Sequence, residues 1–427
     1  MDKACLKCEL PGGMRLLFMP RESDVTYAGI AIAAGTRHEL PDQFGMAHFV
    51  EHMLFKGTQR RKAWHILNRM EAVGGDLNAF TNKEETFVHA TFMRQHLERA
   101  AELLSDIVFH SIFPPAEIEK ETEVIVEEIE SYNDNPAERI YDDFENIIFQ
   151  GHPLGHDILG TAASVRSFTS PQAKAFTQRL YRPERMVFFV RGNYEPAYVQ
   201  RVVTKALSAG APSGPPPRSP HNGGRAYTSK PATIPHSSFL IPHSEGGLIE
   251  RHLHTHQAHV MIGRCAYGCH DPQRYALLLL NNILGGPGMN SRLNLALRER
   301  RGLVYTIEST ITQYTDTATL SIYFGCDPHD INRCLRLVHQ QLRQLSQQTL
   351  SPRQLTAALR QISGQIGIAK DQSENYLLDL TKGFLHTHTI EDAENTLDHL
   401  RQLTPDDLQH VADDLLRPEQ LTTLIYC

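Results

Sequence analysis

The chain has 427 residues, of which 41% are hydrophobic and 21% are charged, and it carries a formal net charge of −7 at pH 7. One hydrophobic core rarely serves so long a chain, so we expect two domains. The negative charge gives no electrostatic basis for binding nucleic acid or an anionic membrane. No segment is apolar enough to span a bilayer, and the start "MDKACLKCELPGG" lacks the apolar core of a signal peptide. We therefore expect a cytoplasmic protein that is not bound to a membrane.

The cysteines favour reduced thiols over a disulfide framework. The chain contains seven of them: Cys5, Cys8, Cys265, Cys269, Cys326, Cys334 and Cys427. An odd number without a signal peptide is typical of free thiols. The first two form one Cys-x-x-Cys, but no second pair is placed to complete a structural zinc site.

The stretch "GMAHFVEHMLFKGT" predicts an amphipathic helix with a polar face that could bind metal. Its apolar residues recur at helical spacing: Met46, Phe49, Val50, Met53 and Leu54. At 100° per residue, His48, Glu51 and His52 point to the opposite side. Both imidazoles could bind one ion, with Glu51 beside them to hold a water. A solvated polar face in a histidine-rich chain is the competing interpretation.

The next segments combine strands with helices. "LNAFTNKEETFVHATF" is rich in strand-forming residues and has turn residues in its middle, while "HLERAAELLSDIVFHSI" has helical periodicity. "PAEIEKETEVIVEEIESYNDNP" predicts another helix, on which Glu121 and Glu128 share a face two turns apart. A catalytic zinc site needs a third protein ligand, and this helix is the best source of one. The alternative is a solvated glutamate face.

The sequence contains an internal repeat, which predicts two domains with the same fold. "FTSPQAKAFTQRLYRPERMVFFV" matches "LTPDDLQHVADDLLRPEQLTTLI" at the chain end, and "VTYAGIAIAAG" matches "QAHVMIGRCAYG" at nearly the same offset. Between the copies, residues 207–241 are dense in Pro, Gly and Ser and predict a linker. We expect domains at residues 1–206 and 242–427. Each should have an α+β fold, with a mostly antiparallel sheet layered with helices.

His48-Phe49-Val50-Glu51-His52 followed by "MLFKGT" resembles the inverted zinc motif of the M16 metallopeptidases, the inverzincins. This family includes the mitochondrial processing peptidase, pitrilysin and insulin-degrading enzyme. The resemblance implies one Zn²⁺ per chain, held by His48, His52 and a glutamate about 76 residues beyond the second histidine, where Glu128 stands. It also implies that Glu51 is the general base and that Glu121 supports a ligand.

Further motifs extend the resemblance over nearly the whole chain. "GGDLNAFTNKEET" is similar to the family's substrate-binding strand, which implies that Asn78, Ala79 and Phe80 bind an extended peptide. "GGPGMNSRLNLALRERRGLVY" resembles the segment that carries the family's Arg…Tyr pair. The resemblance therefore implies that Arg298 and Tyr305 stabilise the oxyanion of the reaction. "HPLGHDILGT" matches another recurring segment.

The resemblance also bears on assembly and on the range of functions. Relatives enclose a chamber with four such domains, and this chain has two, as in the processing-peptidase branch. We expect a homodimer, or a heterodimer with a related M16 chain. The predicted function is a zinc endopeptidase that acts on extended peptides. A maturase for one peptide precursor and a non-catalytic structural subunit are the alternatives.

Overall fold

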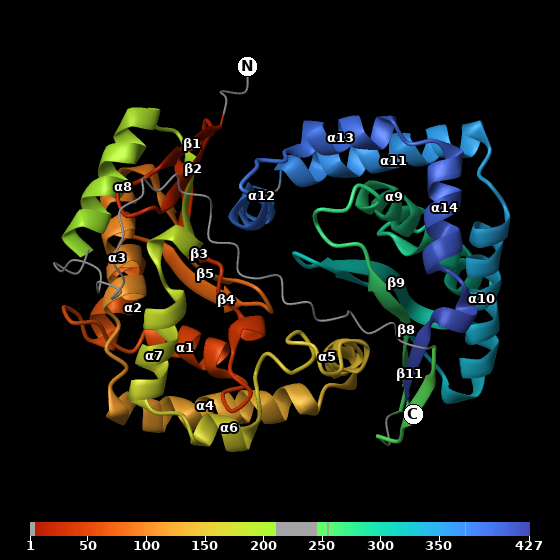
Figure 1. The fold of residues 1–427 in the computed structure, drawn as a ribbon, viewed down its shortest axis with the longest axis horizontal. Coiled ribbons are helices and arrows are strands. Elements are labelled where there is room, and N and C mark those ends of the chain that lie inside the picture. Colours follow the sequence, from red (N-terminus) through yellow and green to blue (C-terminus); the bar gives the residue numbers. More distant parts are fainter. Residues whose placement is uncertain (1–4, 211–245, 254–255, 372) are drawn as a thin grey trace, which may run out of the picture.

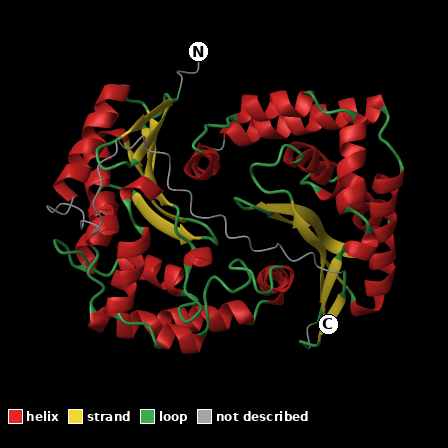
Figure 2. Cartoon of the chain, in the orientation of Figure 1, coloured by secondary structure: helices red, strands yellow, loops and turns green. Residues whose placement is uncertain are grey.

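The computed structural model describes residues 5–210, 246–253, 256–371 and 373–427 (Figure 1). These residues form two halves, each with one sheet, and the helices lie mainly on the outer sides of the two sheets (Figure 2). Of the expected linker, residues 211–241 lie outside the described residues. The expected α+β fold with two homologous domains and mostly antiparallel sheets is confirmed.

The first half holds a six-stranded sheet in the order β1-β2-β6-β3-β5-β4. Its strands are β1 (Leu6–Glu9), β2 (Arg15–Pro20), β3 (Val25–Ile32), β4 (Asp76–Thr81), β5 (Thr86–Met93) and β6 (Met186–Gly192). Neighbouring strands are antiparallel except β2 and β6, which are parallel. β4 lies at one edge, so its outer side has no strand partner within the described residues.

The second half holds a five-stranded sheet in the order β7-β11-β8-β10-β9. Its strands are β7 (Leu248–Arg251), β8 (Ala258–Ala266), β9 (Val304–Gln313), β10 (Ala318–Cys326) and β11 (Thr422–Tyr426). Only β7 and β11 run parallel. β9 and β10 form a hairpin, and β9 lies at one edge of the sheet while β7 lies at the other.

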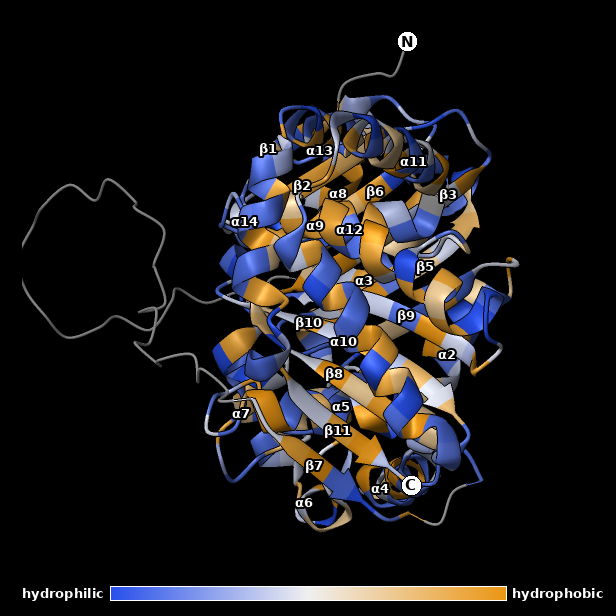
Figure 3. Cartoon of the chain, turned by 90° about the vertical axis from the view of Figure 1, so that its right-hand side faces the viewer, coloured by the Kyte–Doolittle hydropathy of each residue, from blue (hydrophilic) through white to orange (hydrophobic). Residues whose placement is uncertain are grey.

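Most helices are amphipathic and use one face to cover a sheet. The helices of the first half are α1 (Met46–Leu54), α2 (Ala63–Glu71), α3 (Leu97–His110), α4 (Pro115–Asn133), α5 (Pro136–Ile148), α6 (Ala162–Arg166), α7 (Ser170–Leu180) and α8 (Pro196–Gly210). Those of the second half are α9 (Arg274–Gly285), α10 (Ile331–Gln347), α11 (Pro352–Asp371), α12 (Ser373–Thr387), α13 (Ala393–Arg401) and α14 (Pro405–Leu415). Figure 3 shows hydrophobic and hydrophilic residues alternating along them. No described helix combines the length and the hydrophobicity that a membrane crossing requires.

The internal repeat seen in the sequence corresponds to equivalent structure at the end of each half. Thr169 and Thr404 are the N-caps of α7 and α14, and both take part in a capping box with the residue three positions on. Each helix is followed by a short 3-10 turn and then by a strand, β6 or β11. The matching caps explain why these two segments show the clearest similarity.

The expected start of the linker at residue 207 is wrong by one helical turn, because α8 continues to Gly210. Leu207 packs against the hydrophobic core of the first half. The Ser208 hydroxyl donates to the backbone oxygen of Thr204, a bond to the fourth preceding residue that is typical of a helix. The Ser-Ala-Gly composition read as linker therefore begins inside the helix.

The two halves exchange helices across their interface (Figure 1). α5 of the first half packs Phe144 and Phe149 against Tyr323 and Tyr426 of the second sheet. α12 of the second half packs Leu377, Leu380 and Phe384 on the face of the first sheet formed by β2, β3, β5 and β6. Each sheet is thus covered on its inner face by a helix of the other half, which fixes how the halves face each other.

A polar network at the turn between β4 and β5 adds to this interface. Glu84 accepts hydrogen bonds from the Thr315 backbone nitrogen and hydroxyl in the β9–β10 turn, at 2.9 and 2.6 Å. Glu85 is fully buried and pairs with Lys382 at 2.8 Å and with His386 at 3.1 Å, both on α12. Burial opposes the charge on Glu85, but His386 and Lys382 more than offset this effect and lower its pKa to about 2. The ion pair therefore joins the halves through a buried carboxylate.

Replacing Lys382 with Met should destabilise the protein by about 3 kcal/mol at pH 7, because it leaves the buried Glu85 with His386 as its remaining partner in the pair. Glu85 titrates at about 2 in the folded chain and near its ordinary 4.5 when unfolded. The difference in the free energy of unfolding between wild type and variant should therefore have its largest value above pH 4.5 and decrease as the pH falls toward 2. Urea unfolding at several pH values measures it.

The control is Lys205→Met, which removes a mostly exposed lysine and should change stability by less than about 0.5 kcal/mol. If Lys382→Met is no less stable than this control at pH 7, the ion pair does not contribute to holding the halves together.

Candidate metal centre

Two residues, Gly45 and Glu39, determine where α1 begins. Gly45 adopts a left-handed φ of 97°, and a Cβ at this position would lie 2.8 Å from the Leu159 backbone oxygen. The Glu39 carboxylate accepts hydrogen bonds from the backbone nitrogens of Gly45 and Ala47 at 2.9 and 2.7 Å. A carboxylate at this place stabilises the helix N-terminus. The start of α1, and hence the phase of its histidines, is thereby set.

The apolar face of α1 is fully buried in the first core. The residues predicted for this face all have 0% exposed surface: Met46, Phe49, Val50, Met53 and Leu54. Their burial turns His48, Glu51 and His52 toward α4, which crosses α1. The predicted phase of this helix therefore agrees with its packing.

His48, His52 and Glu128 come together between α1 and α4. The Nε2 atoms of His48 and His52 lie 3.7 and 3.4 Å from the two oxygens of Glu128, and the imidazole centroids are 4.5 Å apart. All three residues offer a ligand atom within 4.8 Å of the others. Two ligands about 2 Å from a tetrahedral Zn²⁺ lie roughly 3.3 Å apart. Two nitrogens and one carboxylate at these separations fit a zinc ion.

Glu121, seven residues before Glu128 on α4, contacts the His52 ring on the side away from Glu128. Its Oε1 lies 2.9 Å from His52 Nδ1, which leaves Nε2 free to face Glu128. Its Oε2 lies 2.5 Å from Lys56 Nζ. A carboxylate on the outer nitrogen of a metal-binding histidine fixes the tautomer and the orientation of the ring.

Lys56 was missed by the sequence analysis. It stands in the "MLFKGT" part of the motif, two residues beyond the end of α1, and it anchors the carboxylate that orients this histidine. Helical spacing could not have identified it, because it lies outside the helix that carries His52. Its partner on α4 could not be read from spacing.

Charges in the cluster act strongly on the histidines. Burial and the neighbouring His52 lower the pKa of His48 to about 4, so this ring is a neutral donor at pH 7. Burial also lowers the pKa of His52, but Glu121 and Glu128 outweigh it and raise the value to about 9. The bond to His52 lowers the pKa of Glu128. A metal ion binding here must displace the proton of His52, so its affinity falls at low pH.

Glu51 lies on the same face of α1 and is not used by the three-residue cluster. Burial raises the pKa of its carboxyl group, and the neighbouring Thr81 offsets part of this effect. Its Oε2 is buried and has no hydrogen-bond partner within the described residues. A carboxylate with raised pKa and a free oxygen can accept a proton from a water near the cluster.

The expected substrate strand is β4, and Thr81 at its end is the neighbour of Glu51. Asn78, Ala79 and Phe80 pair with His89, Val88 and Phe87 of β5 on the inner side only. Asn78 is exposed, and the outer backbone edge of β4 is unpaired within the described residues. An extended peptide could add to this edge by main-chain hydrogen bonds.

Arg298 and Tyr305 lie in the second half, away from the cluster. Tyr305 is 82% exposed near the start of β9, and Arg298 is exposed in a six-residue π-helix, Asn294–Glu299. The opposite end of β9 carries the turn that touches Glu84, so Tyr305 is about 30 Å along the strand from this contact. Neither side chain bonds to the first half within the described residues. Within the described residues, no hydrogen bond or ion pair joins either side chain to His48, His52 or Glu128.

Comparisons with known proteins agree with this geometry. Residues 19–162, which contain the whole cluster, match the family described as Insulinase (Peptidase family M16), and residues 167–362 match the Peptidase M16 inactive domain. The chain is 32% identical over 409 residues to a zinc protease of Mycobacterium tuberculosis, covering 95% of this chain and 90% of that protein. A zinc protease of Bacillus subtilis is 30% identical over 347 residues, covering 81% and 80%.

Solved structures with the same fold are more distant in sequence. A protease from Helicobacter pylori superposes with a TM-score of 0.87 at 19% identity, over 100% of both chains. An M16-like peptidase from Alicyclobacillus acidocaldarius gives 0.81 at 21% identity, over 99% of this chain and 98% of that one. The similarity that extends over nearly all of the chain, together with the match that contains the His48–His52 motif, confirms the expected resemblance: the chain belongs to peptidase family M16.

Proposed function

We propose that the chain is a zinc-dependent endopeptidase that hydrolyses extended peptides or unfolded segments. The observation that carries this proposal is the juxtaposition of His48, His52 and Glu128 with the unpartnered oxygen of Glu51. Relatives with about 30% identity are named zinc proteases, which supports the same activity. A structural subunit would have no need of this constellation.

His48, His52 and Glu128 would hold one Zn²⁺ per chain, with Glu121 and Lys56 fixing the His52 ring. A bound zinc ion supplies a Lewis acid that makes water nucleophilic near neutral pH. Glu51 takes the proton of the attacking water and passes it to the leaving amine, a role that suits its raised pKa. The edge of β4 holds the peptide in an extended form beside this group.

Arg298 and Tyr305 would act on the site of a second copy of the chain. Negative charge that develops on the substrate oxygen needs preorganised donors, which a guanidinium and a phenol provide. Tyr305 is exposed and remote from the metal cluster of its own chain. A two-fold homodimer in which the first half of one chain faces the second half of the other would bring them together.

Removing a ligand and removing the base should have different effects. His48→Ala and Glu128→Ala should lose the zinc, because two protein ligands hold the ion poorly. Glu51→Gln should keep about one zinc per chain and lose at least about 100-fold in cleavage of a fluorogenic peptide. Elemental analysis and kcat measure the two effects. Full zinc in either ligand variant, or loss of zinc from Glu51→Gln, contradicts these roles.

Lys56→Met and Glu121→Gln should each weaken zinc binding about 10- to 100-fold, because His52 loses its orienting partner. Competition with a chelator measures the affinity without reference to activity. Lys120→Met is the control, because this lysine is exposed and pairs only with Glu117 among the described residues of α4. Wild-type affinity in Lys56→Met would show that the lysine does not hold Glu121 in its working position.

A mixed dimer tests the shared site. Glu51→Gln and Tyr305→Phe homodimers should both be nearly inactive, since every site in them is damaged. In a hybrid dimer one site collects both substitutions, while the other has an intact Glu51 and an intact Tyr305. If half the dimers are hybrids, about a quarter of all sites should be whole. Peptide cleavage after co-expression measures this fraction.

The hybrid must be verified, for instance with two affinity tags of which both are required for purification. Activity no higher than the average of the two parents in such a hybrid means that Tyr305 does not complete the site of the other subunit.

A further inference from the structure

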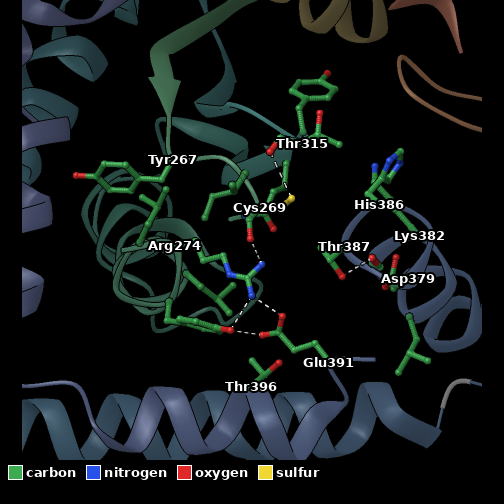
Figure 4. A pocket seen from close by; sticks show the side chains of 18 of the residues that line it. Tyr267, Cys269, Arg274, Thr315, Asp379, Lys382, His386, Thr387, Glu391 and Thr396 are labelled. Carbon is green, nitrogen blue, oxygen red and sulfur yellow. Dashed lines mark hydrogen bonds and ion pairs between the residues drawn. The ribbon is translucent and has the colours of Figure 1, made fainter. Parts of the chain in front are cut away.

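Two cavities of the second half differ in whether their cations are paired. The larger, of about 410 Å³, lies beside α9 and α12 (Figure 4). Its arginine and its lysine are already paired: Arg274 with Glu391, and Lys382 with Glu85. The smaller cavity, of about 200 Å³, lies between α9, the segment before the π-helix, and α11. Its cation has no acidic partner in the described part of the chain, so this cavity is the better candidate for a ligand site.

Arg292 is the charged residue that lines the smaller cavity. Its side chain is half-buried, and desolvation lowers the pKa of its guanidinium. No described acidic residue lines the cavity, and Arg292 has no hydrogen bond or ion pair within the described residues. A half-buried guanidinium without a counter-charge favours an anion, because pairing recovers part of its lost hydration.

Ser291 is a second, independent donor in the same wall. Its side chain is 3% exposed, and its buried Oγ has no hydrogen-bond partner among the residues that the structure describes. Gln354, on the α11 side of the cavity, uses its oxygen to accept from the Ser351 backbone and hydroxyl. The amide nitrogen of Gln354 has no partner within the described residues and can also donate. Three donors of this kind suit the oxygens of a carboxylate or a phosphate.

The other lining residues include the polar amides Asn282, Asn290 and Gln361, which bond to neighbouring side chains, and an apolar part that distinguishes between these anions. Leu279 and Ile283 of α9 line it from one side, and Leu350 and Ala358 line it from the other. A bare phosphate would leave this surface in contact with water. A carboxylate attached to an aliphatic group would bury it, at about 25 cal/mol per Å².

We propose that this cavity binds a free carboxylate carried by an apolar residue, as at the C-terminus of a peptide that ends in an aliphatic side chain. The carboxylate pairs with Arg292 and Ser291, and the side chain packs against Leu279 and Ile283. That the natural ligand is a peptide rests on the proposed function, since a peptidase meets such ends as substrates or products. The binding itself does not require catalysis.

The test uses N-acetyl-L-leucine, N-acetyl-L-leucinamide and inorganic phosphate as probes of the full-length chain in calorimetry. We expect N-acetyl-L-leucine to bind, and the amide to bind about tenfold or more weakly, because it lacks the charge-assisted hydrogen bonds. Arg292→Gln should remove this difference, while Arg292→Lys should retain part of it. Arg360→Gln, which removes an exposed arginine of α11 outside the cavity, should leave it unchanged.

Repeating the titrations in the His48→Ala background separates this site from carboxylate binding at the metal centre. The same preference there supports the inference even if the chain proves not to be a peptidase. Phosphate binding as tightly as N-acetyl-L-leucine would overturn the apolar part of the proposal. Absence of binding, or a preference that survives Arg292→Gln, would overturn the site.

Discussion

The metal cluster depends on the burial of the apolar face of α1 against the first core. Phe49 and Met53 are completely buried, and a rotation of the helix would expose them and turn His48 and His52 away from α4. Each large apolar side chain contributes about 1.5–3 kcal/mol when it is buried, so several together lock the helical phase. The site is therefore precise because its ligands stand on a helix that the core holds in place.

The cluster has more carboxylates than cationic side chains, and this excess of negative charge favours a bound cation. Glu51, Glu121 and Glu128 lie close together, and among the described residues Lys56 pairs with Glu121 but not with the other two carboxylates. In the metal-free chain a proton on His52 supplies part of the missing positive charge, which explains its raised pKa. A divalent cation provides this charge without the proton and leaves both histidines as neutral donors. The acidic excess suits a divalent cation, and it would be unfavourable in a simple buried network.

The exchange of α5 and α12 makes the two halves one unit and has a consequence for the active site. Because these helices fix the relative position of the sheets, the β9–β10 turn meets the first half while the start of β9 points away. Arg298 and Tyr305 are thereby kept from the cluster of their own chain. The same geometry leaves Tyr305 exposed and available to another molecule.

The sequence by itself determined the features that depend on local periodicity and on recurring motifs. The phase of α1, the shared face of Glu121 and Glu128 on α4, and the duplicated caps at Thr169 and Thr404 all follow from helical spacing and capping chemistry. The family was predicted from the resemblance of the His48–His52 motif and of further segments to the M16 metallopeptidases, and the fold class from the pattern of predicted strands and helices. The end of α8 was misjudged because the packing of Leu207 outweighs the local composition.

Only the tertiary structure decided which distant groups meet. How the helices pack decides that Lys56 anchors Glu121 and that Glu85 pairs with α12. It also decides that Arg292 has no counter-charge among the described residues. Two helices come together when their apolar faces are buried, and this packing decides which of their polar side chains meet. The spacing of residues along one helix does not show which other helix it packs against. The same limit applies to Tyr305, whose separation from the cluster is set by the packing of the two halves.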